Sequence, residues 1–251
     1  MSRSQSKFIE KAPARIRLTE EQVAAAEARK AAARERETAR SADDMQEQAA
    51  HVVPYLARRF ELTFRGRVLE LGAGAGWLSA ALSKIPSVVE IIATDPAGRR
   101  LKDEAPEVFR RAGANEAKIT RMTGDLHRLD FPDSHFDFVV CAAVLNRTAN
   151  IVEALREARR VLKPGGRFVA VREPVQPRLQ FKSARSGQKT RGGLELYSLE
   201  DYERFFTAAG FKMESKRVNL DSGMKYFFNE MFNGLTHARY ALVARKPTTR
   251  K

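Results

Sequence analysis

This 251-residue chain has little of several features that define protein classes. A single cysteine, Cys141, excludes an internal disulfide, and its apolar surroundings favour a small buried thiol. No run of about 18 apolar residues exists, so we expect no transmembrane helix. The basic start, Met1–Lys7, has no apolar segment behind it, so we expect no secretory signal and a cytoplasmic protein. Four histidines and one cysteine form no cluster with metal-ligand spacing, and we expect no metal.

Acidic residues are also scarce relative to basic ones, which gives a net charge of +14. The excess is concentrated in residues 172–251, where 16 basic side chains accompany 8 acidic ones. Most of this excess lies in the segment 172–193, which contains six basic residues and one acidic residue, Glu173. Such a segment can attract RNA, a phosphorylated substrate or an acidic membrane surface. A solvated basic loop explains the same pattern equally well.

The most informative segment joins an apolar run to a glycine-rich turn. Val68–Leu71 is followed by Gly72–Gly76, in which every second residue is glycine, and a helical pattern then begins at Trp77. Glycine lets the backbone turn sharply and lets a ligand approach closely. A second apolar run, Ile91–Thr94, ends in Asp95, where a carboxylate can accept hydrogen bonds from ribose hydroxyls. This order of strand, glycine loop and helix predicts a nucleotide-type pocket.

The glycine spacing distinguishes between two classes of cofactor. A dinucleotide fingerprint needs its third glycine at position 77, which is Trp77. The observed pattern E-x-G-x-G-x-G, from Glu70 to Gly76, resembles motif I of the class I S-adenosylmethionine-dependent methyltransferases. The resemblance implies that S-adenosyl-L-methionine is the cofactor, with its methionine part over the glycine loop and its ribose held by Asp95.

Two later segments resemble the same family. Thr123–Leu126 follows a predicted strand, and the resemblance implies that the Asp125 carboxylate and the Leu126 N–H bind adenine, although an Asp that caps a turn is the alternative. Phe131–Asp137 precedes a continuous apolar run that ends at Ala142. The cofactor-binding residues implied by the resemblance are Glu70, Gly72, Ala73, Gly74, Gly76, Asp95, Pro96, Asp125, Leu126 and Ala142.

No general base stands out. Where many members of the family that act on small molecules carry a histidine pair, this chain has Asn146 and Arg147. Glu173 and His127 are the candidates for a catalytic base. The alternative for Glu173 is a carboxylate that is solvated or paired with Arg172, and the alternative for His127 is a surface position. Because an activated sulfonium mainly requires a positioned acceptor, we leave the catalytic residue unassigned.

Repeated strand–helix units predict an α/β fold: a doubly wound, seven-stranded, mostly parallel sheet with helices on both faces, an antiparallel last strand and extra N-terminal helices. We expect strands at 67–71, 89–94, 118–123, 136–142, 167–172, 212–219 and 238–244. The predicted organisation is a disordered basic N-terminus (1–18), a helical extension (19–65), a methyltransferase domain (66–246) with substrate-side insertions at 173–197 and 221–236, and a basic tail (247–251).

Three hypotheses for function follow. The first is a methyltransferase that O- or N-methylates a small or medium-sized acceptor. The second is an RNA methyltransferase that binds phosphates through the basic segment 172–193. The third is a non-catalytic, methyltransferase-like subunit. The sequence assigns neither the acceptor nor the oligomeric state.

Overall fold

The computed structural model describes residues 50–176, 188–189, 195–219 and 238–248. These all belong to the larger of two compact units, which begins at Ala42. The predictions for the basic N-terminus, for the helix expected from residue 19, for the insertion 221–236 and for most of the basic segment 172–193 lie outside the described residues. No helix within the described ranges is long and apolar enough to cross a membrane.

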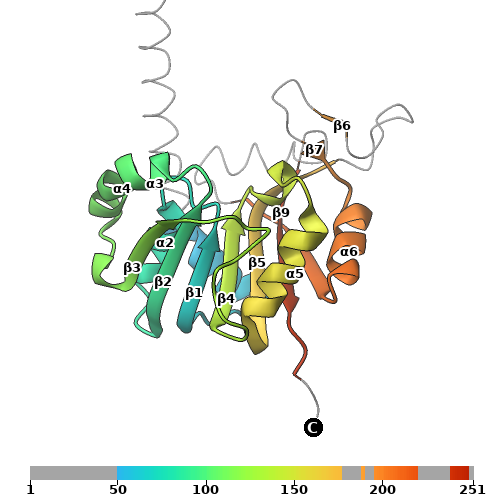
Figure 1. The fold of residues 1–251 in the computed structure, drawn as a ribbon, viewed down its shortest axis with the longest axis horizontal. Coiled ribbons are helices and arrows are strands. Elements are labelled where there is room, and N and C mark those ends of the chain that lie inside the picture. Colours follow the sequence, from blue (N-terminus) through green and yellow to red (C-terminus); the bar gives the residue numbers. More distant parts are fainter. Residues whose placement is uncertain (1–49, 177–187, 190–194, 220–237, 249–251) are drawn as a thin grey trace, which may run out of the picture. The chain divides into compact units, whose positions relative to one another are not determined.

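One seven-stranded sheet, in the order β3-β2-β1-β4-β5-β9-β8, forms the centre of this unit (Figure 1). Only β9 runs antiparallel to the other strands. A separate two-stranded sheet pairs β6 with β7 inside the segment predicted as an insertion. The predicted sheet is therefore confirmed. The strands are β1 (Gly66–Leu71), β2 (Val88–Asp95), β3 (Ile119–Thr123), β4 (Phe136–Ala142), β5 (Leu162–Val175), β6 (Gln188–Lys189), β7 (Glu195–Leu196), β8 (Lys212–Arg217) and β9 (Ala238–Arg245).

Helices cover both faces of the sheet. Alternate side chains of the central parallel strands β1, β4 and β5 enter opposite cores, as Val68 and Leu69 do on β1. The core that contains Val68 is closed by the helix of residues 50–60 and by α2, and the core that contains Leu69 is closed by α5 and α6 (Figure 1). The helical elements are α2 (Trp77–Ser83), α3 (Arg99–Asp103), α4 (Ala105–Ala112), η1 (Glu116–Lys118), η2 (Leu145–Arg147), α5 (Ile151–Val161) and α6 (Leu199–Ala208).

The structure corrects the predicted start of the fifth strand. We expected a strand at 167–172, but β5 already begins at Leu162, which pairs with Phe136. The ladder then skips the turn at 163–166 and resumes with Phe138 opposite Arg167. At its other end β5 continues to Val175, so the first residues of the predicted insertion 173–197 pair with β9.

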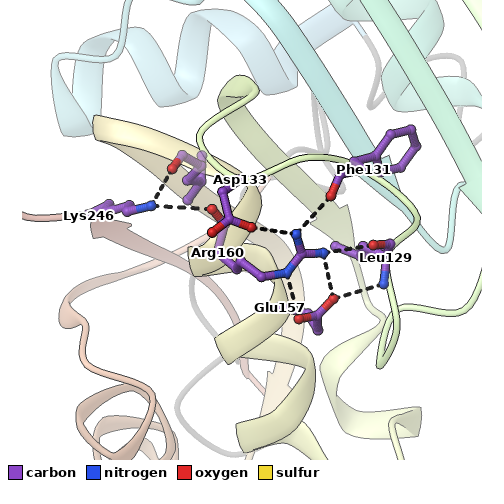
Figure 2. Close-up of polar contacts among 7 residues, drawn as sticks. Leu129, Phe131, Asp133, Glu157, Arg160 and Lys246 are labelled. Carbon is purple, nitrogen blue, oxygen red and sulfur yellow. Dashed lines mark hydrogen bonds and ion pairs between the residues drawn. The ribbon is translucent and has the colours of Figure 1, made fainter.

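Arg160 fastens the loop before β4 to helix α5 (Figure 2). Its guanidinium donates to the carbonyl oxygens of Leu129 (2.7 Å) and Phe131 (2.8 Å), and it forms ion pairs with Asp133 and Glu157. These carboxylates raise the pKa of Arg160 further above its ordinary value. The loop after β3, which carries part of the predicted adenine site, is thus tied to the helix that follows β4.

Candidate functional site

The predicted site residues gather where the strand order reverses. β1 lies between β2 and β4, so the loops that leave the carboxyl ends of β1 and β4 go to opposite sides and open a crevice between them. The glycine loop follows β1, Asp95 ends β2, and Ala142 ends β4. Residues that are 19 to 70 positions apart in sequence thus meet at the carboxyl ends of the parallel strands.

The glycine loop and Asp95 are joined directly. The Gly74 N–H donates to Oδ2 of Asp95 at 3.0 Å, and the Ala73 N–H donates to the Thr94 carbonyl at 2.9 Å. Oδ1 of Asp95 accepts from the N–H groups of Ala97 (3.0 Å) and Gly98 (3.2 Å). A carboxylate has about four lone-pair sites, so Asp95 is fixed in place and keeps acceptor capacity for a ligand hydroxyl.

The glycines of the loop differ in what surrounds them. A Cβ on Gly76 would lie 2.7 Å from the Phe109 ring, and one on Gly72 would lie 2.7 Å from Val144, so both positions are closed by packing. A Cβ on Gly74 would meet only the Arg100 guanidinium, at 3.6 Å. Gly74 therefore presents open backbone, with φ of +55°, at the place where the cofactor's methionine part is predicted.

Glu70 is buried beneath the loop. Only 1% of it is exposed, and its carboxylate accepts a hydrogen bond from the Ser79 hydroxyl on α2. Burial, and secondarily the nearby charge of Asp95, raises the pKa of Glu70 to about 7, although Ser79 opposes the shift. The contact fastens α2 to β1, so Glu70 shapes the loop from below. Ser79 has a role that the sequence analysis did not assign.

Asp125 and His127 form a hydrogen-bonded pair within the loop after β3. Oδ1 of Asp125 accepts from the backbone N–H and from Nδ1 of His127, both at 2.9 Å, which lowers the pKa of the largely exposed Asp125. Nε2 of His127 accepts the Asn150 N–H at 3.3 Å, so the proton lies on Nδ1. Both ring nitrogens are occupied within the fold, and this geometry argues against His127 as a general base.

Glu173 is fully buried, which excludes the alternative of a solvated carboxylate. Its oxygens accept the N–H groups of Val144 (2.9 Å), Leu145 (3.2 Å) and Asn146 (3.4 Å) at the start of η2. Desolvation raises the pKa of Glu173 to about 7 against the opposing effect of these hydrogen bonds. The carboxylate thus holds the turn after β4 rather than facing a substrate.

The turn that Glu173 holds is also strained. Ala143, between Ala142 and Val144, has φ of +54°, which costs a residue with a Cβ about 1–2 kcal/mol. Asn146 is 2% exposed, and its Oδ1 has no hydrogen-bond partner among the residues that the structure describes. The sequence analysis noted Asn146 only as a departure from the family. Within the described ranges, no three His, Cys, Asp or Glu side chains are grouped as a metal site.

The fold and this arrangement define a class I, Rossmann-like methyltransferase domain. Residues 69–170 match the family described as "Methyltransferase domain". The match confirms the class predicted from Glu70–Gly76, Asp95 and Asp125.

Individual relatives agree with this class. A demethylmenaquinone methyltransferase of Deinococcus radiodurans is 34% identical over 151 residues, covering 52% of this chain and 60% of the relative. A phosphoethanolamine N-methyltransferase of Haemonchus contortus, solved with S-adenosyl-L-methionine, has a TM-score of 0.57 at 16% identity and covers 78% of this chain and 52% of that one. The chain spans little more than half the length of these relatives.

The same fold also occurs in a protein that is titled as a [4+2]-cyclase. The cyclase SpnF has a TM-score of 0.60 at 21% identity, over 78% of this chain and 80% of that one. Identity this low establishes the fold alone. The choice between methyl transfer and another use of the fold therefore rests on the site.

Proposed function

We propose that this protein transfers a methyl group from S-adenosyl-L-methionine to a small or medium-sized acceptor. The observation that carries the proposal is the bond between the Gly74 N–H and Asp95, which holds an open glycine loop and an acceptor carboxylate together before any ligand arrives. The cofactor supplies an electrophilic methyl on its sulfonium, so the protein's task is mainly to position the acceptor.

The residues fit this cofactor. Asp95 keeps an acceptor site for a ribose hydroxyl, and Gly74 offers uncovered backbone to the methionine part. Asp125, with 65% of its side chain exposed, stands next to the Leu126 N–H where the adenine is predicted. Glu70 and Gly76 act behind this surface by holding the loop's shape.

The acceptor is proposed to need no strong general base from the described residues. Glu173 is engaged with three backbone N–H groups, and His127 with Asp125 and Asn150. A weakly basic amine, an acidic hydroxyl or an electron-rich ring carbon meets this condition, because each has its nucleophilic form populated near neutral pH. The printed name of the Deinococcus relative, a demethylmenaquinone methyltransferase, makes a quinone-like acceptor in its reduced, electron-rich quinol form the first to test.

The experiment has two stages on the full chain. Calorimetry should detect S-adenosyl-L-methionine binding, and Asp95→Asn should weaken it by at least about 100-fold, because it removes a charged acceptor that serves both the ribose and the Gly74 N–H. The exposed residue Asp130 supplies the matched control, Asp130→Asn, which should bind as the wild type does. If the wild type does not bind the cofactor at all, the proposal is wrong.

In the second stage, labelled S-adenosyl-L-methionine is incubated with the protein and fractionated extract. Label in a low-molecular-weight product supports the proposal, and label in RNA would favour the alternative based on the segment 172–193. Cofactor binding without any transfer, with both extract and quinone acceptors, would indicate a non-catalytic subunit or a use of the fold like that of the cyclase.

A further inference from the structure

A polar cavity lies on the side of the sheet opposite the glycine loop, at the ends of the strands where β4 and β5 begin and β9 ends. It encloses about 350 Å³ between the segment before β1, the turn at 163–166 and the end of β9. Four basic side chains line it against two acidic ones. The basic residues are Arg65, Lys163, Arg167 and Arg245, and the acidic ones are Glu61 and Asp137.

The pairing of the strands brings like charges together beside this cavity. Arg167 on β5 is directly opposite Arg245 on β9, and Arg245 is in turn opposite Lys212 on β8. Directly opposite residues point to the same face of a sheet, and like charges in such positions repel each other. Three cations thus stand side by side across three strands.

The acids of the cavity do not neutralise this row. Asp137 is occupied by Lys163, at 2.7 Å, and by the Arg67 N–H at 2.9 Å. Neither Arg167 nor Arg245 forms an ion pair with any residue that the structure describes. The cavity therefore combines a net positive lining with two guanidinium groups that have no carboxylate partner among the described residues, and a bound anion would relieve their repulsion.

We propose that this cavity binds a phosphate group, either free or as the ester of a small molecule. Guanidinium groups match the oxygens of a phosphate in pairs, which is the geometry that two neighbouring arginines provide. The site is separate from the glycine loop, which lies at the carboxyl ends of the parallel strands. The proposal goes beyond methyl transfer and does not depend on it.

The test uses calorimetric titration of the full-length protein with inorganic pyrophosphate at low ionic strength. The wild type should bind, and the double variant Arg167→Gln/Arg245→Gln should bind at least about tenfold more weakly, because two charge-assisted contacts are lost. Arg110→Gln/Arg111→Gln on α4 removes the same net charge from an exposed surface and should leave the affinity unchanged. Equal affinity of the wild type and the first variant, or no binding by the wild type, would overturn the proposal.

Thermal unfolding separates a binding role from a structural one. In phosphate-free buffer the Arg167/Arg245 variant should be at least as stable as the wild type, because a repulsion has been removed. Added pyrophosphate should raise the midpoint of the wild type only. A variant that is markedly less stable without phosphate would show that the arginines hold the fold, against the proposal.

Two further titrations identify the source of the phosphate. Ribose 5-phosphate binding more tightly than inorganic phosphate would indicate an ester, and equal affinities would indicate the free ion. Binding of a single-stranded RNA oligonucleotide that depends on both arginines, without any pyrophosphate binding, would refute the small-ligand site. S-adenosyl-L-methionine binding, measured on the same samples, should not respond to the double variant.

Discussion

Glu173→Gln tests the buried carboxylate that holds the turn after β4. The substitution keeps the size of the side chain and removes its ionisation. Glu173 has a pKa raised to about 7 in the folded protein, against an ordinary value of 4.5. A carboxyl group whose pKa is higher in the folded than in the unfolded protein stabilises the folded state while it is protonated. This stabilisation is lost as the pH rises and the group ionises. Its contribution is therefore highest below pH 4.5 and declines as the pH rises through 7.

The size of the effect follows from the two pKa values. A shift of about 2.5 units corresponds to about 3 kcal/mol of free energy of unfolding, lost between the unfolded pKa and the folded one. Between pH 5 and pH 8, the wild type should lose about 2–3 kcal/mol at this residue alone. Glu70, whose pKa is also raised to about 7, adds a decline of the same sign.

Urea unfolding at pH 5, 6, 7 and 8, at constant ionic strength, measures this decline. The amide at position 173 introduces its own cost, because its NH₂ cannot accept a backbone N–H, but that cost is the same at every pH. The stability of the wild type minus that of Glu173→Gln should fall by about 2–3 kcal/mol over this range. Glu203→Gln, at an exposed position of α6, should follow the wild type. Parallel curves for the wild type and Glu173→Gln would refute the raised pKa.

Three further predictions concern the loop, the α5 anchor and the thiol. Gly74→Ala should lower the free energy of unfolding by about 1 kcal/mol, because alanine is strained in the left-handed backbone of this position. Gly76→Ala should lower it by about 2–4 kcal/mol, because its Cβ also collides with Phe109. Equal losses in thermal unfolding would contradict this difference in packing. Arg160→Met should cost about 2–3 kcal/mol in the urea assay, because it leaves the Leu129 and Phe131 carbonyls without this donor. Arg110→Met, which removes an exposed ion pair, should cost much less in the same assay. Cys141 is fully buried, and burial, followed by the charges of Glu173 and Glu70, raises the pKa of its thiol, so it should react with a disulfide reagent only after unfolding; fast reaction of the native protein would contradict this.

The parts of the fold that could be predicted are those with local signals. The apolar runs of β1, β2 and β4 and the alternating glycines specify strands and a turn from neighbouring residues alone. The early start of β5 could not be predicted in this way. Leu162 continues the helical pattern of α5, and only its pairing with Phe136, 26 positions earlier, makes it a strand residue.

The candidate site likewise contains residues whose role could be predicted from nearby sequence and residues whose role depends on distant partners. Asp95 could be placed from the sequence because it ends a strand at a fixed distance from the glycine loop. The role of Glu173 could not, because its three N–H donors come from residues 27 to 29 positions earlier. His127 resembles a free base in sequence for the same reason: one of its partners, Asn150, lies 23 residues away.

The bond between the Gly74 N–H and Asp95 also has a consequence for protein engineering. One carboxylate serves both as part of the scaffold and as the predicted point of nucleoside recognition, so selection cannot alter the second role without disturbing the first. A library that varies Asp95 alone to accept altered cofactors would mostly yield displaced loops. Redesign should first give the glycine loop another anchor and only then vary the recognition residue.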